Sequence, residues 1–362
     1  MNKEPADVLV PALLMLMHLR TRPRLSAKVK IPTMMALVAL LIVSGCGLVH
    51  RKVETEKLLT PLTNATTPDL IAAVNKLVGA NSIHGLVDIQ FEDTSFASSG
   101  LAEKYRTVPG SITLQRPGKI YLSIQAPLVA TDIVQMTSDG EHFRIAILKG
   151  DDKIRKFVKG TNNAVYAKLD MDGNATAGDK NSEAQTVNAL SNLRPQHLTD
   201  ALLLNPINAQ TPGTFYVQSE FFESEKDPTK ADGNKRVVRG YYFLDEVIAN
   251  GDKGARLARR FWFDRVGGLR LARLQSFDDS GILANDVTYG PLTRFGTEGN
   301  VLLPAKISLT RPHDQYKINI SYQTPESLTI DHDYPSDAFV LTNKWNLPEV
   351  DLDQKKPSPP KN

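Results

Sequence analysis

The segment Ser111–Gln125, SITLQRPGKIYLSIQ, decides the fold of this chain. Apolar and polar residues alternate on both sides of a central Arg-Pro-Gly-Lys turn, which is the pattern of two half-buried antiparallel strands joined as a hairpin. One face of such a hairpin must be covered, while the other can face water. The apolar positions of the hairpin are Ile112, Leu114, Ile120, Leu122 and Ile124.

The same alternation continues over most of the chain. Val87, Ile89 and Phe91 alternate with polar residues ahead of the hairpin. Short turns separate most of the predicted strands, which favours an antiparallel meander. We therefore expect a mainly β protein with a few helices (α+β), built on about eleven strands. Further strands fit residues 131–137, 142–148, 214–222, 237–248, 256–264, 269–276, 282–289, 304–311 and 315–323.

Two helices are expected to pack on this sheet. Thr67 as the N-cap, Pro68 at the first helical position and Gly79 at the end delimit an amphipathic helix. Residues 160–213 are rich in Asn, Asp, Gly and Ala and include a second short helix at 195–204, so we expect a loop-plus-helix insertion there. A single domain is expected over residues 67–345. Residues 346–362 contain few apolar residues and are predicted to be a disordered tail.

An open or curled sheet can hide its inner face in two ways. It can close around its own side chains, or it can curl incompletely and be covered by helices that leave an apolar cavity. Each inward-facing residue is therefore a candidate for a cavity wall or for plain core. These candidates are Val87, Ile89, Phe91, Ile112, Leu114, Ile120, Leu122, Ile124, Phe143 and Ile145.

The N-terminal residues have the plan of an export signal. Basic residues between 20 and 30 precede an apolar run at 35–43, which is too short to span a membrane. Val43-Ser44-Gly45-Cys46 resembles the bacterial lipobox, in which the cysteine becomes a lipid-modified N-terminus. We expect a signal peptide at 1–45, lipidation of Cys46 and a polar tether at 46–66. The alternative is a buried, reduced cysteine.

A lipid anchor at Cys46 would place the domain in the cell envelope, facing the periplasm. Gly47 follows the cysteine, and aspartate at this position is the enteric signal for retention at the inner membrane, so the outer membrane is favoured. The chain has 43 Lys/Arg and 40 Asp/Glu, of which the first 45 residues hold six and two, which leaves the remainder close to neutral. Without a basic stripe, no nucleic-acid partner is predicted.

No catalytic pattern is found. The sequence has no Gly-x-Ser-x-Gly nucleophile motif, phosphate loop or dinucleotide fingerprint. Asp331-His332-Asp333 is the nearest approach to a metal cluster, but adjacent residues on an extended segment point to opposite faces. We predict no enzyme activity, no cofactor and no metal.

Several short motifs resemble the lipoprotein-localisation (Lol) family over residues 83–342. The matching segments are Gly110–Ile120, Ala126-Pro127-Leu128, Ser138–Phe143, Phe261–Asp264 with Gly267-Gly268-Leu269, Leu303–Ile307 and Asp337–Leu341. The resemblance implies an incomplete β-barrel whose concave face, covered by helices, shelters acyl chains. It implies an acceptor or carrier of acylated lipoproteins or other envelope lipids, with a periplasmic carrier as a partner.

The resemblance also suggests roles for two further sites. Pro127, Leu128 and Val129 match a loop that contacts the membrane in the acceptor branch of the family. Arg116 falls in the Arg-Pro-Gly turn. In the carrier branch of the family, an arginine near this region hydrogen-bonds the covering helices, and the resemblance implies the same role for Arg116. Two alternatives stay open: a periplasmic module that senses lipids and signals through a protein contact, and a structural envelope lipoprotein without a ligand.

Overall fold

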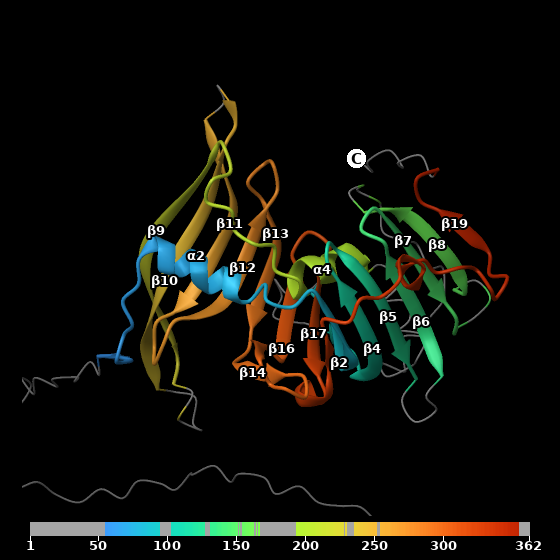
Figure 1. Cartoon of the computed structure of the whole chain (residues 1–362), viewed down its shortest axis with the longest axis horizontal. Coiled ribbons are helices and arrows are strands. Elements are labelled where there is room, and N and C mark those ends of the chain that lie inside the picture. Colours follow the sequence, from blue (N-terminus) through green and yellow to red (C-terminus); the bar gives the residue numbers. More distant parts are fainter. Residues whose placement is uncertain are drawn as a thin grey trace, which may run out of the picture. The chain divides into compact units, whose positions relative to one another are not determined.

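The computed structural model describes residues 55–94, 103–126, 131–150, 154–162, 193–227, 235–251 and 254–354, with residues 152, 164, 166 and 229. The chain divides into two compact units, Met1–Thr55 and Glu56–Asn362, and every element below belongs to the second. In the described part, a 17-stranded sheet and a separate 2-stranded sheet dominate (Figure 1). The expected mainly β architecture is confirmed, and the structure has more strands than the eleven expected.

The large sheet is an open, largely antiparallel meander. β9 pairs only with β10 and β19 only with β8, so in the described residues these strands are the two edges and the sheet does not close. The strands follow one another across the sheet in the order β9 (Thr214–Lys226), β10 (Arg236–Ala249), β11 (Ala255–Asp264), β12 (Arg270–Phe277), β13 (Leu283–Tyr289), β16 (Lys306–Arg311), β17 (Tyr316–Tyr322), β2 (Ser82–Asp93), β4 (Val108–Gln115), β5 (Lys119–Gln125), β6 (Asp132–Ser138), β7 (His142–Ile147), β8 (Lys156–Thr161) and β19 (Glu349–Asp351).

Short strands complete the structure. β1 (Lys57–Leu58) adds to β10 in parallel, while β3 (Glu103–Lys104) and β18 (Thr329–Ile330) extend the pairing of β2. β14 (Leu292–Phe295) and β15 (Val301–Pro304) form the separate hairpin. Two 3-10 turns follow β17, η3 (Pro325–Ser327) and η4 (Ser336–Phe339). The strand expected at 304–311 corresponds to β16, except that Pro304 ends β15 and the chain joins the large sheet at Lys306.

The predicted hairpin is present as β4 and β5. Gln115 pairs with Lys119 across a three-residue turn, and Leu114 pairs with Ile120 on the buried face. Gly118 at the end of the turn has φ +67°, a conformation that favours glycine. The β4 strand of the hairpin pairs with β2. On its other edge β2 pairs with β17, with Ile89 opposite Ile320. This pairing joins the early and late strands of the chain into one sheet.

Two α-helices pack against the sheet, as expected. α2 (Thr67–Lys76) contacts β9 and β12, and α4 (Pro195–Leu202) contacts β5, β6 and β16 (Figure 1). The N-cap of α2 is Thr66, one residue before the predicted Thr67, because the Asp69 carboxylate accepts hydrogen bonds from the Thr66 amide (2.8 Å) and hydroxyl (2.7 Å). Buried residues of both helices belong to the same hydrophobic core as the strands.

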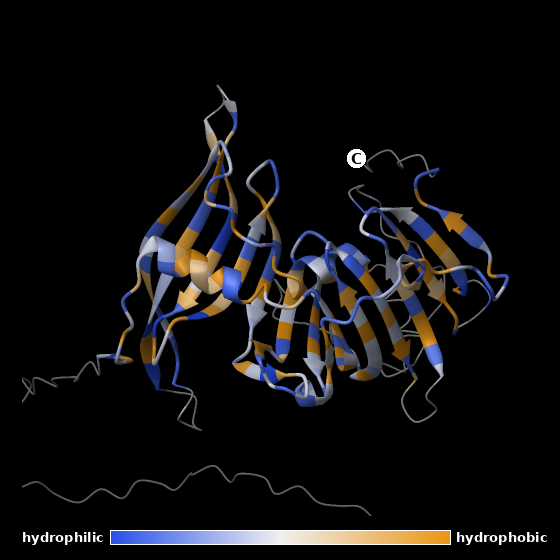
Figure 2. Ribbon diagram, viewed as in Figure 1, coloured by the Kyte–Doolittle hydropathy of each residue, from blue (hydrophilic) through white to orange (hydrophobic). Residues whose placement is uncertain are grey.

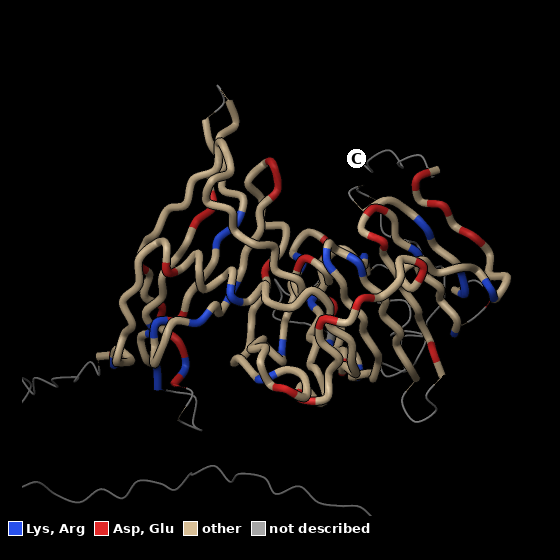
Figure 3. Tube along the Cα trace, viewed as in Figure 1, with Lys and Arg blue, Asp and Glu red and all other residues tan. Residues whose placement is uncertain are grey.

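Hydropathy alternates along the strands, as Figure 2 shows, and the apolar half of each strand feeds the core. Lys and Arg residues and Asp and Glu residues are interspersed along the chain (Figure 3). The predicted disordered tail, 346–362, is ordered as far as residue 354, and residues 355–362 lie outside the described residues. Leu347 and Leu352 are buried, and β19 between them pairs with β8, so two apolar anchors outweigh the polar composition of this segment.

Candidate functional site

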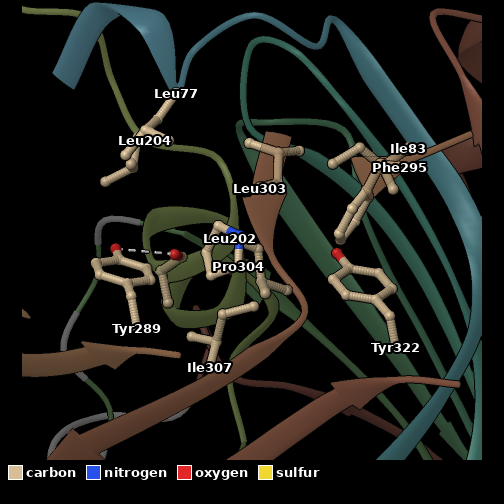
Figure 4. Close-up of a pocket in the computed structure, with 11 residues that line it drawn as sticks. Leu77, Ile83, Leu202, Leu204, Tyr289, Phe295, Leu303, Pro304, Ile307 and Tyr322 are labelled. Carbon is tan, nitrogen blue, oxygen red and sulfur yellow. Dashed lines mark hydrogen bonds between the residues drawn. The ribbon is translucent and has the colours of Figure 1, made fainter. Parts of the chain in front are cut away.

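An apolar cleft lies where the ends of both helices meet strands from the late half of the chain. Leu77 caps the C-terminal end of α2, and Leu202 and Leu204 lie at and just after the end of α4. The cavity volume is about 20 Å³, which is room for about one water molecule. The cleft is lined by Leu77, Ile83, Ala201, Leu202, Leu204, Tyr289, Phe295, Leu303, Pro304, Ile307 and Tyr322 (Figure 4).

Two tyrosine hydroxyls are the polar side-chain groups of this lining, and their surroundings differ. The Tyr289 hydroxyl donates a hydrogen bond to the carbonyl of Ala201 at 3.1 Å and so fastens β13 to the last turn of α4 (Figure 4). The Tyr322 hydroxyl has no hydrogen-bond partner among the residues that the structure describes. Burial raises the pKa of both phenols, so both are protonated at physiological pH.

The cover of the cleft is held together by a reciprocal pair of hydrogen bonds. The Asn75 side-chain amide donates to the carbonyl of Ile207 at 2.9 Å, and the amide of Ile207 donates to the Asn75 Oδ1 at 2.7 Å. Asn75 belongs to α2, whereas Ile207 follows α4, so this pair ties the two halves of the cover to each other. Ile207 is buried and Asn75 is exposed, so both bonds are partly buried.

A buried polar contact holds α4 from its other side. His197 Nδ1 and the Tyr316 hydroxyl lie 2.7 Å apart, joining α4 to β17. Burial lowers the pKa of His197 to about 3, and the nearby guanidinium of Arg311 acts in the same direction. The imidazole is therefore neutral at physiological pH, and this contact is a neutral hydrogen bond.

The ten residues expected to face inward are all buried in one hydrophobic core. They lie on β2, β4, β5 and β7, and none of them is among the residues that line the cleft. The structure thus places Val87, Ile89, Phe91, Ile112, Leu114, Ile120, Leu122, Ile124, Phe143 and Ile145 in the packed part of the core. Their role as a cavity wall stays a prediction.

Arg116 contacts the connection between α2 and β2. Its Nε donates to the carbonyl of Ala80 at 3.1 Å, and its amide donates to the carbonyl of Asn81 at 2.9 Å. Desolvation lowers the pKa of this guanidinium. These bonds reach the chain just after α2, and the expected contact of Arg116 with the helices themselves stays a prediction.

Two predicted sites lie outside the described residues. Cys46, the expected lipidation site, precedes the first described residue, and Pro127, Leu128 and Val129 fall between two described ranges. Among the residues that are described, no helix is long and apolar enough to cross a membrane. The same residues contain no cluster of three or more His, Cys, Asp or Glu side chains that could hold a metal ion.

A second hollow, of about 340 Å³, lies beside β6 and differs in chemistry from the apolar cleft. Lys149, Lys344 and Asp132 contribute charged groups to its lining. The Asp132 carboxylate accepts hydrogen bonds from the Ser123 hydroxyl at 2.6 Å and from the side chain of Gln135. This polar lining is unsuited to an alkyl chain.

The lining of the apolar cleft could not be identified from alternation alone. Tyr289, Phe295 and Tyr322 come from three different strands, which β-sheet pairing and the small hairpin bring together. One sequence signal pointed to the region, since Leu303-Pro304 belongs to a motif on which the family resemblance rests. The residues on the cover, Leu77 and Leu204, follow their helices and carry no distinguishing signal of their own.

No family model matches this chain, and no curated protein matches it in sequence. Solved structures do match. A LolA superfamily protein from Nitrosomonas europaea is 11% identical, with a TM-score of 0.38, over 76% of this chain and 99% of that one. A DUF1329 family protein from Desulfovibrio piger is 10% identical, with a TM-score of 0.38, over 78% and 97%.

A third match is a domain from Vibrio parahaemolyticus, provisionally described as an outer membrane lipoprotein-sorting protein domain. It is 9% identical, with a TM-score of 0.34, over 76% of this chain and 94% of that one. At these identities and TM-scores, the matches assign neither a family nor a function to this chain.

Proposed function

We propose that this protein is a membrane-anchored lipid-binding protein that shelters acyl chains and acts as an acceptor or carrier of lipoproteins in the cell envelope. One observation carries the proposal: an apolar cleft lies under a cover made of the ends of two helices that are far apart in the sequence. A cover of this kind can separate from the sheet without breaking any strand pairing. Cys46 would supply the membrane anchor.

The cleft must widen to admit a ligand, since about 20 Å³ accommodates a single water molecule. The hydrogen bonds that hold the cover include the reciprocal Asn75–Ile207 pair and the Tyr289–Ala201 bond. Each contributes a net stabilisation of about 1 kcal/mol. An acyl chain of roughly fifteen methylenes gains about 12 kcal/mol when it is buried. Burial of the chain therefore exceeds the cost of breaking these bonds.

The test is the binding of a fluorescent fatty-acyl probe to the purified full chain. Leu77→Glu introduces a charge into the cover of the cleft and should abolish binding, because an alkyl chain cannot solvate a carboxylate. Leu86→Glu is the matched control, since Leu86 is 53% exposed on β2, and should bind like the wild type. Equal binding by the wild type and Leu77→Glu would remove the cleft as the site.

A second candidate, a structural envelope lipoprotein without a ligand, is favoured by one observation. In this structure the core is filled by its own side chains, and the cleft is no larger than a water molecule. If neither the wild type nor the Leu86→Glu control binds acyl probes, this structural function replaces the lipid-binding one.

A further inference from the structure

We propose that Tyr322 is the polar anchor of the cleft and that its hydroxyl donates a hydrogen bond to a neutral carbonyl of the ligand, such as the ester of an acyl chain. This inference rests on the proposed lipid-binding function and deepens it, because it names the chemical class of the ligand. It also predicts a preference among ligands that a plain apolar cleft would not have.

The position of Tyr322 is fixed by its neighbours. Its amide donates to the carbonyl of Ala305 at 2.9 Å, and β17 pairs it with Val87 of β2. Its ring packs edge-on against Phe295, with the ring centroids 5.1 Å apart. In Figure 4 the hydroxyl of Tyr322 points to the side of the cleft where Phe295 and Leu303 lie.

Tyr322 differs from the other buried tyrosines of the cleft region in what its hydroxyl contacts. The Tyr289 hydroxyl donates to a carbonyl at 3.1 Å, and the Tyr316 hydroxyl lies 2.7 Å from His197 Nδ1. Tyr322 is only 6% exposed, yet its hydroxyl has no partner among the described residues. The hydroxyl oxygen keeps some exposed surface where the side chain borders the cleft. A phenol that borders the cleft, and whose proton no described residue accepts, can donate a hydrogen bond to a ligand.

The chemistry of the lining defines that partner. A protonated phenol donates, so the ligand must present an acceptor. The lining contains no cationic residue, and a carboxylate without a cation is costly to bury. A neutral ester or amide carbonyl meets both conditions, whereas a free fatty acid does not. Such an ester can come from a phospholipid or from the diacylglyceryl group of a lipoprotein.

The experiment compares two ligands that differ in one carbonyl. 1-Palmitoylglycerol, an ester, and 1-O-hexadecylglycerol, its alkyl ether, each displace a fluorescent acyl probe from the full-length protein. We expect the wild type to bind the ester about tenfold more tightly than the ether, which is the effect of one hydrogen bond of ~1.4 kcal/mol. Palmitate should bind less tightly than the ester.

Two variants assign this preference to a single hydroxyl. Tyr322→Phe should bind the ester and the ether equally, while the matched control Tyr241→Phe, at a buried tyrosine outside the cleft, should keep the preference. Equal affinities in the wild type, or an unchanged ratio in Tyr322→Phe, would overturn the assignment and leave the hydroxyl with a bound water. The wild-type comparison decides the matter even if a variant does not fold. Absence of probe binding to the wild type would instead overturn the proposed function.

The two sources of an ester are separated by two further ligands, a dipalmitoyl phospholipid and a diacylated lipopeptide. Both should lose affinity in Tyr322→Phe if they bind through this hydroxyl. The ligand that binds the wild type more tightly identifies the source of the ester, and an affinity that Tyr322→Phe leaves unchanged for both would again overturn the assignment.

Discussion

Asn75 and Ile207 hold each other through two hydrogen bonds, one in each direction between a side-chain amide and a backbone peptide. Asn75 lies in the last turn of α2, and Ile207 lies shortly after the end of α4. The pair therefore joins two segments that are 132 residues apart in the sequence. Its strength determines how readily the cover of the apolar cleft separates.

Asn75→Ala should loosen the cover and accelerate binding. We expect the association rate of a fluorescent acyl probe to rise several-fold and the free energy of unfolding to fall by about 1–3 kcal/mol, because two buried peptide groups lose their partners. Asn75→Asp keeps the acceptor for the Ile207 amide and loses the donor, so its effects should be smaller. Stopped-flow fluorescence measures the rate, and an association rate equal to that of the wild type would contradict a gating role.

Arg265 should be essential for holding the segment before the first helix. Its Nε donates to the carbonyl of Thr63 at 3.1 Å, a terminal nitrogen donates to Asn64 at 3.0 Å, and the guanidinium lies 4.1 Å from the centre of the Tyr242 ring. We expect Arg265→Met to lower the free energy of unfolding by about 2–3 kcal/mol in urea denaturation, since the partly buried Thr63 carbonyl and the Asn64 side-chain oxygen lose their donor.

Limited proteolysis gives a local measure of the same contact. In Arg265→Met, cleavage between residues 56 and 66 should become faster than in the wild type. Arg256→Met is the control, because Arg256 pairs with Asp279, whose side chain is 94% exposed, and its loss should change stability by no more than about 0.5 kcal/mol. Equal cleavage in both variants would mean that Arg265 does not hold this segment.

His197 should make the protein less stable in acid. In the folded state its pKa lies at about 3, chiefly through burial and through Arg311, whereas the unfolded chain binds a proton near the ordinary value of 6.5. The unfolded state therefore binds more protons between these two values. The free energy of unfolding should fall as pH decreases through this window. Arg194 opposes protonation as Arg311 does, and Asp314 favours it.

The contribution of His197 can be isolated by difference. His197→Gln removes the titration and can still hydrogen-bond the Tyr316 hydroxyl, so its stability should depend less on pH than that of the wild type in urea titrations at pH 7, 5.5 and 4.5. His313→Gln is the control, because the side chain of His313 is 81% exposed. If His197→Gln and the wild type lose stability in parallel, His197 is not the group responsible.

Cys46→Ser tests the proposed anchor. A serine has no thiol to receive the lipid, so the variant should stay unprocessed and carry no labelled fatty acid. Metabolic labelling with a radioactive fatty acid and the mass of the purified protein measure these two effects. Normal labelling and membrane association of Cys46→Ser would end the proposal of a lipid anchor.

Much of the fold could be predicted because alternation is a local signal. The hairpin at 111–125 was predicted with its turn, and the strands expected at 142–148, 256–264 and 282–289 correspond closely to β7, β11 and β13. Other strands lack this signal. β9 was expected to end at 222 but continues to Lys226, since Phe221 and Phe222 interrupt the alternation while the pairing with β10 continues.

The site could be predicted less well, because it depends on contacts between distant segments. Alternation shows which side chains of a strand share a face, but Ile112 and Tyr322 share the same core, and only the latter borders the cleft. What distinguishes Tyr322 is the absence of a partner for its hydroxyl among the described residues, a property of three-dimensional packing. Leu347 and Leu352 show the opposite case, in which two buried leucines hold a segment of otherwise polar composition.

The pairing of β2 with β17 also constrains the order of folding. Glu92 and Asn319, which are hydrogen-bonded at 2.8 Å, are 227 residues apart in the sequence. Contacts of such separation form slowly because a long loop must close first. The chain is synthesised from its N-terminus, so β2 can pair with β4 early. The other edge of β2 cannot pair with β17 until β17 has been synthesised. Throughout that interval the free edge of β2 is open to pairing with other chains, which makes it a site where aggregation can begin.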